Sequence, residues 1–232
     1  MKFIDKLIHK LILKKGFKYY QEDKYFIKQV LKFSENKNIK VLDVGCGNGH
    51  YSFLFESYGA EVTAFDYNED LIKKANEKKK ELNSNVEFLV ADGRYPEKYF
   101  TDKFEIVFLS GFALFGINQN RELMEKYLLL LDKGGKLIFV HSSNLTGDIR
   151  KTRWRNHKIE ELKSFFESLD CTIEEIYFYD RHINIKLFHS FVFNGLSTKI
   201  HILISRITKL PCSLVFIVKR QVKPQNHVFS SG

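Results

Sequence analysis

Short apolar runs alternate with charged amphipathic segments through the middle of the chain. Five of the runs predict buried strands: Lys40–Val44, Glu61–Asp66, Val86–Ala91, Phe104–Ser110 and Lys136–His141. Apolar residues recur at helical spacing between these strands and predict three helices: Tyr51–Tyr58, Glu69–Leu82 and Gln119–Leu131. Strands that alternate with helices form parallel units with right-handed crossovers. We therefore expect an α/β fold with a doubly wound, mostly parallel sheet.

Helical spacing also marks both sides of this alternating region. Apolar residues recur at helical spacing from Phe3 to Ile12, with lysines on the other face, and a second helix is predicted over Tyr19–Phe33. After residue 156 the pattern predicts a helix, a strand, a helical insertion and a last strand, at Lys158–Leu169, Cys171–Phe178, Asn184–Leu210 and Ser213–Lys219. We expect one domain over residues 1–220, with a helical cap (1–36), a core (37–145) and substrate-side segments with the insertion (146–210). Residues 221–232 have no periodicity and are expected to form a flexible tail.

The composition argues against several classes of protein. Hydrophobic residues make up 44% of the 232 positions, which is enough for a continuous core. Cys46, Cys171 and Cys212 have neither zinc-ligand spacing nor a disulfide pattern, so no metal is expected. No apolar stretch is long enough for a transmembrane helix, and lysines interrupt the N-terminal apolar segment that a signal peptide would need. We expect a cytoplasmic protein.

Basic residues outnumber acidic residues by 37 to 28, which gives a formal charge of +9. Such a surplus attracts anions, which could be nucleic acid, an acidic membrane surface or a phosphorylated small substrate. The densest basic cluster contains Arg150, Arg153 and Arg155, whose guanidinium groups suit phosphate and carboxylate. A cluster of this kind is equally typical of solvated surface, so charge alone leaves these alternatives open.

A glycine-rich turn follows the first predicted strand. It reads Asp43-Val44-Gly45-Cys46-Gly47-Asn48-Gly49 and precedes a helix, so it lies at the carboxyl edge of the sheet, where ligands bind. Its spacing differs from the dinucleotide fingerprint G-x-G-x-x-G, because His50 stands where the third glycine would be. Asp43 would repel a pyrophosphate, whereas it suits the amino group of a bound amino acid or the backbone donors of the turn. Cys46 has no activating neighbour in the sequence, which favours packing over nucleophilic chemistry.

Three further strand ends present polar or small residues to the same crevice. Asp66 ends the second strand, where a carboxylate can accept hydrogen bonds from both hydroxyl groups of a ribose. Asp92, followed by Gly93, ends the third strand and is placed to meet the exocyclic amine of adenine. Ser110 ends the fourth strand, opposite the first turn. The structural alternatives are a helix cap for Asp66 and an ordinary loop acid for Asp92.

This constellation resembles the class I S-adenosylmethionine (SAM)-dependent methyltransferase family over Ile39–Val140. The first motif matches at the aspartate and glycines of the turn, and Leu131-Asp132-Lys133-Gly134-Gly135 matches a later motif, with Lys133 where proline is common. The resemblance implies a Rossmann-like seven-stranded sheet of order 3-2-1-4-5-7-6, with Ser213–Lys219 as the reversed strand. It implies SAM as cofactor and S-adenosylhomocysteine (SAH) as its product. The residues then expected to bind the cofactor are Asp43, Gly45, Cys46, Gly47, Gly49, Asp66, Tyr67, Asp92, Gly93, Ser110 and Tyr20.

The acceptor of the methyl group has to be inferred from other features. A hydroxyl acceptor needs a base, and His141 at the end of the fifth strand is the catalytic candidate, with a structural role as the alternative. The residues Ser110-Gly111-Phe112-Ala113 replace the Asn/Asp-Pro-Pro-aromatic motif of amino-directed nucleic-acid methyltransferases, which argues against base N-methylation. We expect O-methylation of a small anionic acceptor, such as a phosphorylated or nucleotide-linked sugar of polysaccharide biosynthesis, held by Arg150, Arg153 and Arg155.

Two other functions stay open at this point. An RNA methyltransferase would use the basic surplus, although no recognition module or long basic arm is evident, and no stable nucleic-acid complex is expected. A noncatalytic SAM-binding or membrane-surface protein would use the basic amphipathic N-terminal helix. That helix could instead cover the sheet or form a homodimer contact.

Overall fold

The computed structural model describes residues 27, 30–32, 39–110, 121–143, 159–179 and 212–220. Ile27, Val30 and Leu31 are helical and belong to the second predicted N-terminal helix. The rest of that cap, the basic cluster, the helical insertion and the tail lie outside the described residues, so those predictions stay predictions.

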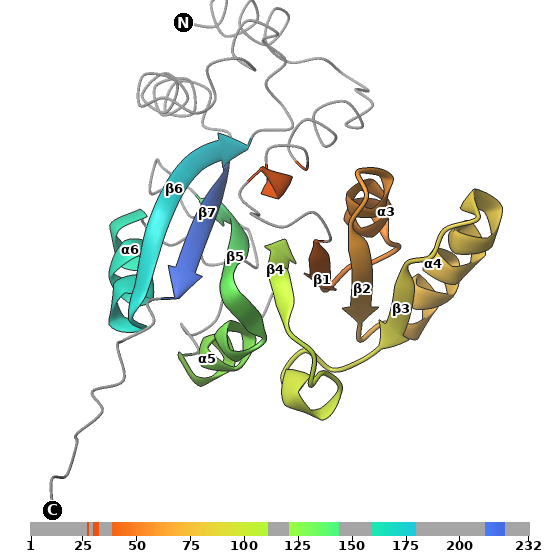
Figure 1. Ribbon diagram of the computed structural model, residues 1–232, viewed down its shortest axis with the longest axis horizontal. Helices are drawn as coiled ribbons and strands as arrows, with labels where there is room; N and C mark the ends of the chain where they lie inside the picture. Colours follow the sequence, from red (N-terminus) through yellow and green to blue (C-terminus); the bar gives the residue numbers. More distant parts are fainter. Residues whose placement is uncertain are drawn as a thin grey trace, which may run out of the picture.

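The described residues form one seven-stranded sheet with the order β3-β2-β1-β4-β5-β7-β6 (Figure 1). The first five strands pair in parallel, whereas β7 is antiparallel to both β5 and β6. The predicted doubly wound α/β fold and its strand order are therefore confirmed. The strands are β1 (Lys40–Val44), β2 (Glu61–Asp66), β3 (Glu87–Val90), β4 (Phe104–Ser110), β5 (Leu131–Ser143), β6 (Cys171–Tyr179) and β7 (Cys212–Arg220).

Helices cover both faces of the sheet, because alternate residues of the central strands are apolar on each side. One face packs against α3 (His50–Ser57) and α4 (Glu69–Leu82), and the other packs against α5 (Arg121–Leu129) and α6 (Ile159–Ser168). A short 3-10 helix, η1 (Pro96–Lys98), lies in the connection from β3 to β4. Figure 1 shows α4 beside β3 at one edge of the sheet and α6 beside β6 at the other.

Local signals fix the ends of α4. The side chain of Asn68 accepts a hydrogen bond from the backbone N–H of Leu71, so it caps the first turn. The last turn ends at Asn83, which takes the left-handed conformation with a φ of 51°. These caps explain why the charged segment Glu69–Leu82 forms a helix with the predicted bounds.

Strand β5 begins earlier than the predicted Lys136–His141. Leu131 already pairs with Phe104, and the next pair is Lys136 with Ile106. This shift in register leaves the residues between Leu131 and Lys136, including the two glycines, as an irregular part of the strand. Gly134 has a φ of 83°, and a Cβ atom on Gly135 would come within 2.9 Å of the carbonyl oxygen of Phe104. The two glycines therefore let the strand bend past β4 without losing its pairing.

The parallel strands end together, and this positions the site. Val44 of β1 pairs with Phe65 of β2 on one side and with Leu109 of β4 on the other. The last residue of β2 pairs with the last residue of β3, and the last residue of β4 pairs with Val140 of β5, which continues three residues further. The loops that follow these strands thus leave from one edge of the sheet, as ligand-binding loops of such folds do. Within the described ranges, no helix is long and apolar enough to cross a membrane.

Candidate functional site

The glycine turn folds tightly over the carboxyl end of β1. Gly45, Gly47 and Gly49 all have positive φ angles, of 70°, 58° and 83°. The backbone N–H groups of Gly45 and Cys46 both donate to the carbonyl oxygen of Phe65 at 2.9 Å, which ties the turn to β2. Residues other than glycine rarely adopt this left-handed backbone, so the conformation favours glycine at all three positions.

The three glycines differ in what surrounds them. A Cβ atom on Gly49 would lie 2.7 Å from the ring of Phe88, so this glycine is needed for packing against the sheet. A Cβ atom on Gly47 would meet no atom of the described residues within 4 Å. These residues therefore leave the space above Gly47 open, and a ligand could approach the backbone there.

Asp66 holds the turn from the end of β2. Its Oδ2 atom accepts the backbone N–H of Gly47 at 3.0 Å, and its Oδ1 atom accepts that of Asn68 at 2.9 Å. The residue is only 7% exposed. Each carboxylate oxygen has two acceptor lone pairs, so each can accept one further hydrogen bond from a ligand. Two hydroxyl groups on adjacent carbons, as in a ribose, match this arrangement.

Asp43 lies beneath the turn and is only 2% exposed. The hydroxyl group of Ser52, on the first turns of α3, donates to its Oδ2 atom at 2.6 Å. Burial raises the pKa of the Asp43 carboxyl group to about 7, and the hydrogen bond from Ser52 opposes this rise. Asp43 is therefore too buried to be a surface contact of the site. It can act on the site through its charge, and its hydrogen bond with Ser52 links the end of β1 to α3.

Asp92 follows β3 and forms an ion pair with Arg94. The guanidinium group donates to both carboxylate oxygens, with the shortest contact at 2.6 Å from Nη2 to Oδ2. The backbone N–H of Arg94 also donates to Oδ1. These hydrogen bonds lower the pKa of Asp92 and fill its acceptor positions. The exocyclic amine of adenine could therefore bind Asp92 only if the exposed Arg94 side chain moved aside.

The other predicted residues in the described part of the site differ in their exposure. Tyr67 follows Asp66 and is 80% exposed, so its ring is free to lie against a flat ligand. Gly93 is buried and its carbonyl oxygen accepts the hydroxyl group of the buried Tyr127 at 2.6 Å. Ser110 ends β4 and is partly exposed. The pKa of Cys46 is raised far above its ordinary value by burial, so this thiol is a poor nucleophile.

The remaining predicted residues cannot be placed in the same detail. The backbone of His141 lies in β5, opposite Leu214 of β7, and its side chain is outside the described residues. Tyr20, Arg150, Arg153 and Arg155 also lie outside them. No group of His, Cys, Asp and Glu within the described ranges could hold a metal ion.

The comparison with known protein families decides what kind of domain this is. A family model described as a methyltransferase domain matches residues 35–183, which is more than half of the chain. The chain belongs to this methyltransferase domain family. The prediction of a class I SAM-dependent methyltransferase is confirmed, because the family and the strand order both agree with it.

Individual relatives of this methyltransferase domain support the assignment. A region of 53 residues is 42% identical to the probable S-adenosyl-L-methionine-dependent methyltransferase TehB of Haemophilus influenzae (strain 10810). This region is 23% of the chain and spans only 18% of the length of that relative.

Two solved structures share the fold. The PH0226 protein of Pyrococcus horikoshii OT3 has a TM-score of 0.62 and 23% identity, over 89% of this chain and 93% of that one. A SAM-dependent methyltransferase of Geobacter sulfurreducens in complex with S-adenosyl-L-homocysteine has a TM-score of 0.60 and 16% identity, over 86% and 91%.

The described residues of the methyltransferase domain fit SAM. The open space above Gly47 admits a ligand to the backbone of the turn, and the remaining lone pairs of Asp66 fit the ribose hydroxyl groups. Tyr67 and the segment around Asp92 are the candidates to hold the adenine, and the turn that follows Asp43 is the candidate to hold the amino-acid part. When bound, SAM supplies an electrophilic methyl group on a positively charged sulfur.

Three residues that matter to this site escaped the sequence analysis. Ser52 holds Asp43, Arg94 holds Asp92, and Tyr127 of α5 holds the backbone of Gly93. Arg94 follows Asp92 by two positions, so its pairing could have been considered. Nothing in the local pattern marks Ser52 or Tyr127, because their partners are brought to them by the packing of α3 and α5 on the sheet.

Proposed function

We propose that this SAM-dependent methyltransferase transfers its methyl group to a small anionic acceptor at the carboxyl edge of the sheet, with O-methylation as the reaction. A phosphorylated or nucleotide-linked sugar fits this description. The observation that carries the proposal is the uneven distribution of charge between the body of the sheet and the segments attached to it.

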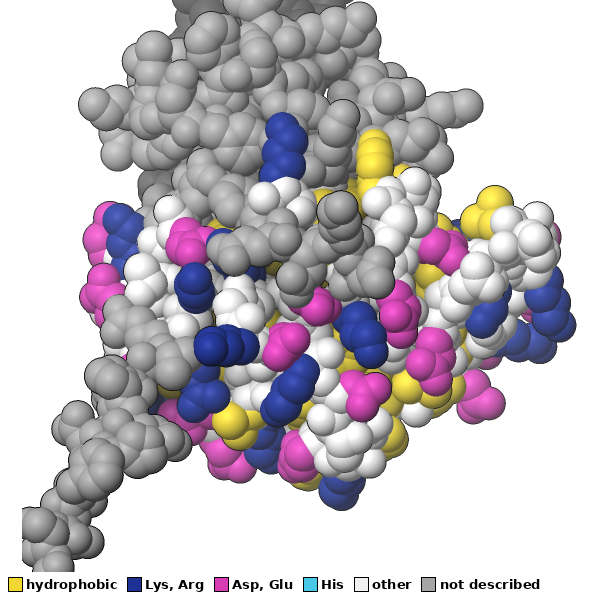
Figure 2. All heavy atoms as spheres, in the orientation of Figure 1, with side chains coloured by type: hydrophobic (Ala, Val, Ile, Leu, Met, Phe, Trp, Pro, Cys, Tyr) yellow, Lys and Arg dark blue, Asp and Glu magenta, His cyan; other side chains and the backbone are white. Residues whose placement is uncertain are grey.

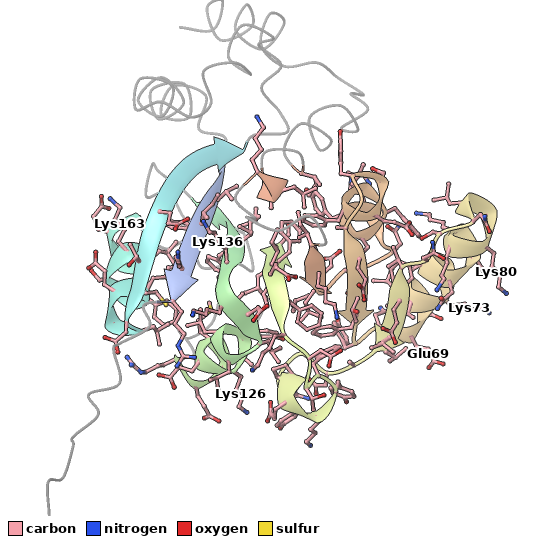
Figure 3. The ribbon with its side chains drawn as sticks, in the orientation of Figure 1. Glu69, Lys73, Lys80, Lys126, Lys136 and Lys163 are labelled. Carbon is pink, nitrogen blue, oxygen red and sulfur yellow. The ribbon has the colours of Figure 1, made fainter. Side chains whose placement is uncertain are left out.

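The body of the domain is acidic although the chain as a whole is basic. Residues 39–143, 159–179 and 212–220 contain 16 basic and 22 acidic residues. Lys and Arg side chains lie interspersed with Asp and Glu on the face shown in Figure 2. The lysines of α4 and α6 labelled in Figure 3, Lys73, Lys80 and Lys163, point away from the sheet. The described surface in view therefore offers no basic face of its own.

The remaining segments contain 21 basic and 6 acidic residues, so they carry the whole positive surplus. Two of them, 144–158 and 180–211, each have five basic residues and one acidic residue. Ser143 at the end of β5 pairs with Cys212 at the start of β7, and Tyr179 at the end of β6 pairs with Ser213. Both segments therefore start at the carboxyl edge of β5, on the side of the sheet where the glycine turn lies. This placement supports an anionic acceptor.

The chemistry requires little from the protein beyond positioning. The methyl group leaves a sulfonium that needs no further activation, so the gain comes from holding the two reactants in line and excluding water. An ionised phosphate or carboxylate oxygen needs no base. A hydroxyl acceptor would need one, and His141 is the candidate for that role. Arg150, Arg153 and Arg155 would hold the charge of the acceptor.

The experiment uses methyl-labelled SAM with fractionated small metabolites and, separately, with RNA. We expect label in an anionic small-molecule fraction. The double substitution Arg153→Ala and Arg155→Ala should lower this incorporation at least about tenfold, the loss expected when charge-assisted hydrogen bonds are removed, while SAM affinity stays within twofold. The matched control, Lys73→Ala with Lys80→Ala on the outer face of α4, should leave both unchanged.

Three results would overturn the proposal in different ways. Label found only in RNA would replace the small acceptor by a nucleic acid. Incorporation that the arginine substitutions leave intact would assign those residues to solvated surface. Equal loss of SAM affinity and incorporation would make the arginine segment structural.

A further inference from the structure

The carboxylate that follows β3 is covered by the side chain of Arg94. Nε of Arg94 lies 3.0 Å from both oxygens of Asp92, and Nη2 lies 2.6 Å from Oδ2. The backbone N–H of Arg94 also donates to Oδ1, at 2.9 Å. Each oxygen thus accepts from two nitrogen atoms, which matches its two lone pairs. With Arg94 in this position, Asp92 has no acceptor site left for a ligand.

The backbone on both sides of Asp92 is held in place. The N–H of Ala91 donates to the carbonyl oxygen of Asp66 at 3.1 Å, which ties the loop to the end of β2. The carbonyl oxygen of Gly93 accepts the hydroxyl group of Tyr127 at 2.6 Å. The carboxylate of Asp92 therefore stays beside the strand end that carries Asp66. A nucleoside whose ribose binds Asp66 would bring its base toward Asp92.

The Arg94 side chain, in contrast, can be displaced at little cost. The side chains of Arg94 and Asp92 are 62% and 32% exposed, and exposed ion pairs are weak because water and salt screen them. Among the residues that the structure describes, Asp92 forms an ion pair with Arg94 alone. The Cζ atom of Arg94 also lies 5.7 Å from the centroid of the Tyr95 ring, so an aromatic face is within reach once the guanidinium leaves Asp92.

The two arrangements of Arg94 present opposite chemistry to a base. An uncovered Asp92 accepts hydrogen bonds and suits the exocyclic amine of adenine, whereas a covered Asp92 presents only the N–H donors of the guanidinium. We propose that Arg94 sets how strictly the protein reads this amine, because it competes with the amine for Asp92. The inference rests on the proposed function, since it requires the cofactor to bind with its adenine at the end of β3.

The prediction concerns the preference for adenine over a base that carries an acceptor at the same place. SAH has the exocyclic amine, and its deaminated analogue, S-inosylhomocysteine, has a carbonyl oxygen there. In Arg94→Ala the backbone N–H of residue 94 remains, and Oδ2 of Asp92 becomes available. SAH should then bind more tightly relative to the analogue. We expect the ratio of the two affinities to rise about two- to fivefold, the range over which exposed ion pairs act.

Isothermal titration calorimetry of the full chain with both ligands measures this ratio. Effects that change both affinities alike cancel in the ratio, so a small loss of stability does not imitate the result. The matched control is Lys98→Ala, which removes an equal charge from the same connection. The Nζ atom of Lys98 lies 4.4 Å from the centroid of the Tyr95 ring, so its removal leaves the Asp92–Arg94 pair in place and the ratio unchanged.

The double variant Arg94→Ala with Asp92→Ala completes the test. It lacks both the competitor and the carboxylate, so the gain seen in Arg94→Ala should disappear. An equal ratio in the natural protein and in Arg94→Ala, an equal rise in Lys98→Ala, or a gain that persists in the double variant would overturn the inference and leave the proposed function intact. Failure of the natural protein to bind either SAM or SAH would overturn both.

Discussion

Replacing Gly47 by alanine tests whether the open space above the turn is where the cofactor approaches the backbone. Gly47 has a φ of 58°, and an added Cβ atom would meet no atom within 4 Å in the part of the chain that the structure describes. The left-handed backbone costs a residue with a Cβ atom about 1–2 kcal/mol, and no steric overlap adds to this. The hydrogen bond from the Gly47 N–H to Asp66 can persist, because alanine keeps the N–H. We therefore expect a folded variant that is less stable by about that amount.

Gly59→Ala is the matched control for backbone strain. Gly59 has a φ of 89°, and an added Cβ atom there also meets no described atom within 4 Å, but Gly59 lies in the connection from α3 to β2, at the other edge of the sheet. Both variants should lose similar stability in urea unfolding. Only Gly47→Ala should weaken SAM binding in calorimetry, by at least about tenfold, which corresponds to about 1.4 kcal/mol.

The two variants together make the reasoning refutable. If Gly47→Ala binds SAM as tightly as the natural protein while it loses the same stability as Gly59→Ala, the cofactor does not use the space above the turn. If both variants lose SAM affinity equally, the loss reflects general destabilisation rather than the site.

Asp66→Ala removes the carboxylate that is expected to bind the ribose, and SAM affinity should fall by roughly 1.5–3 kcal/mol, as for hydrogen bonds to a charged group. Calorimetry on the folded variant measures this loss, and undiminished affinity would remove Asp66 from the cofactor site. Tyr127→Phe deletes the buried hydroxyl group that donates to the carbonyl oxygen of Gly93 at 2.6 Å. The free energy of unfolding should fall by about 1–2 kcal/mol, and an unchanged urea midpoint would show that this hydrogen bond contributes nothing net.

The local pattern of apolar and polar residues was sufficient to predict the bounds of elements whose ends are marked in their own sequence. Strands β1, β2 and β4 and helix α4 have the bounds predicted from sequence, because each is an apolar run or an amphipathic segment with clear ends. The order of the strands did not come from this pattern. It was implied by the family resemblance of the glycine turn and the strand ends, since periodicity shows which face of a strand is buried but not which strand lies beside it.

Pairing with a neighbouring strand sets the start of β5, which the local sequence pattern predicts incorrectly. The sequence predicts that β5 starts at Lys136, because Asp132 and the two glycines are typical of a turn. In the structure Leu131 pairs with Phe104 of β4, and the register shift admits the glycines into the strand. A pattern within a short stretch of sequence cannot show this pairing, because the residues of the neighbouring strand are distant along the chain.

Glycine spacing and the residues that end the strands are local features, so they predict which residues lie at the carboxyl edge. The state of those residues depends on the folded protein. Burial beneath the turn raises the pKa of the Asp43 carboxyl group to about 7, and the hydrogen bond from Ser52 of α3 opposes this rise. Protonation, burial and hydrogen-bond partners depend on atoms that are distant along the chain, so they become defined only when the sheet and its helices come together.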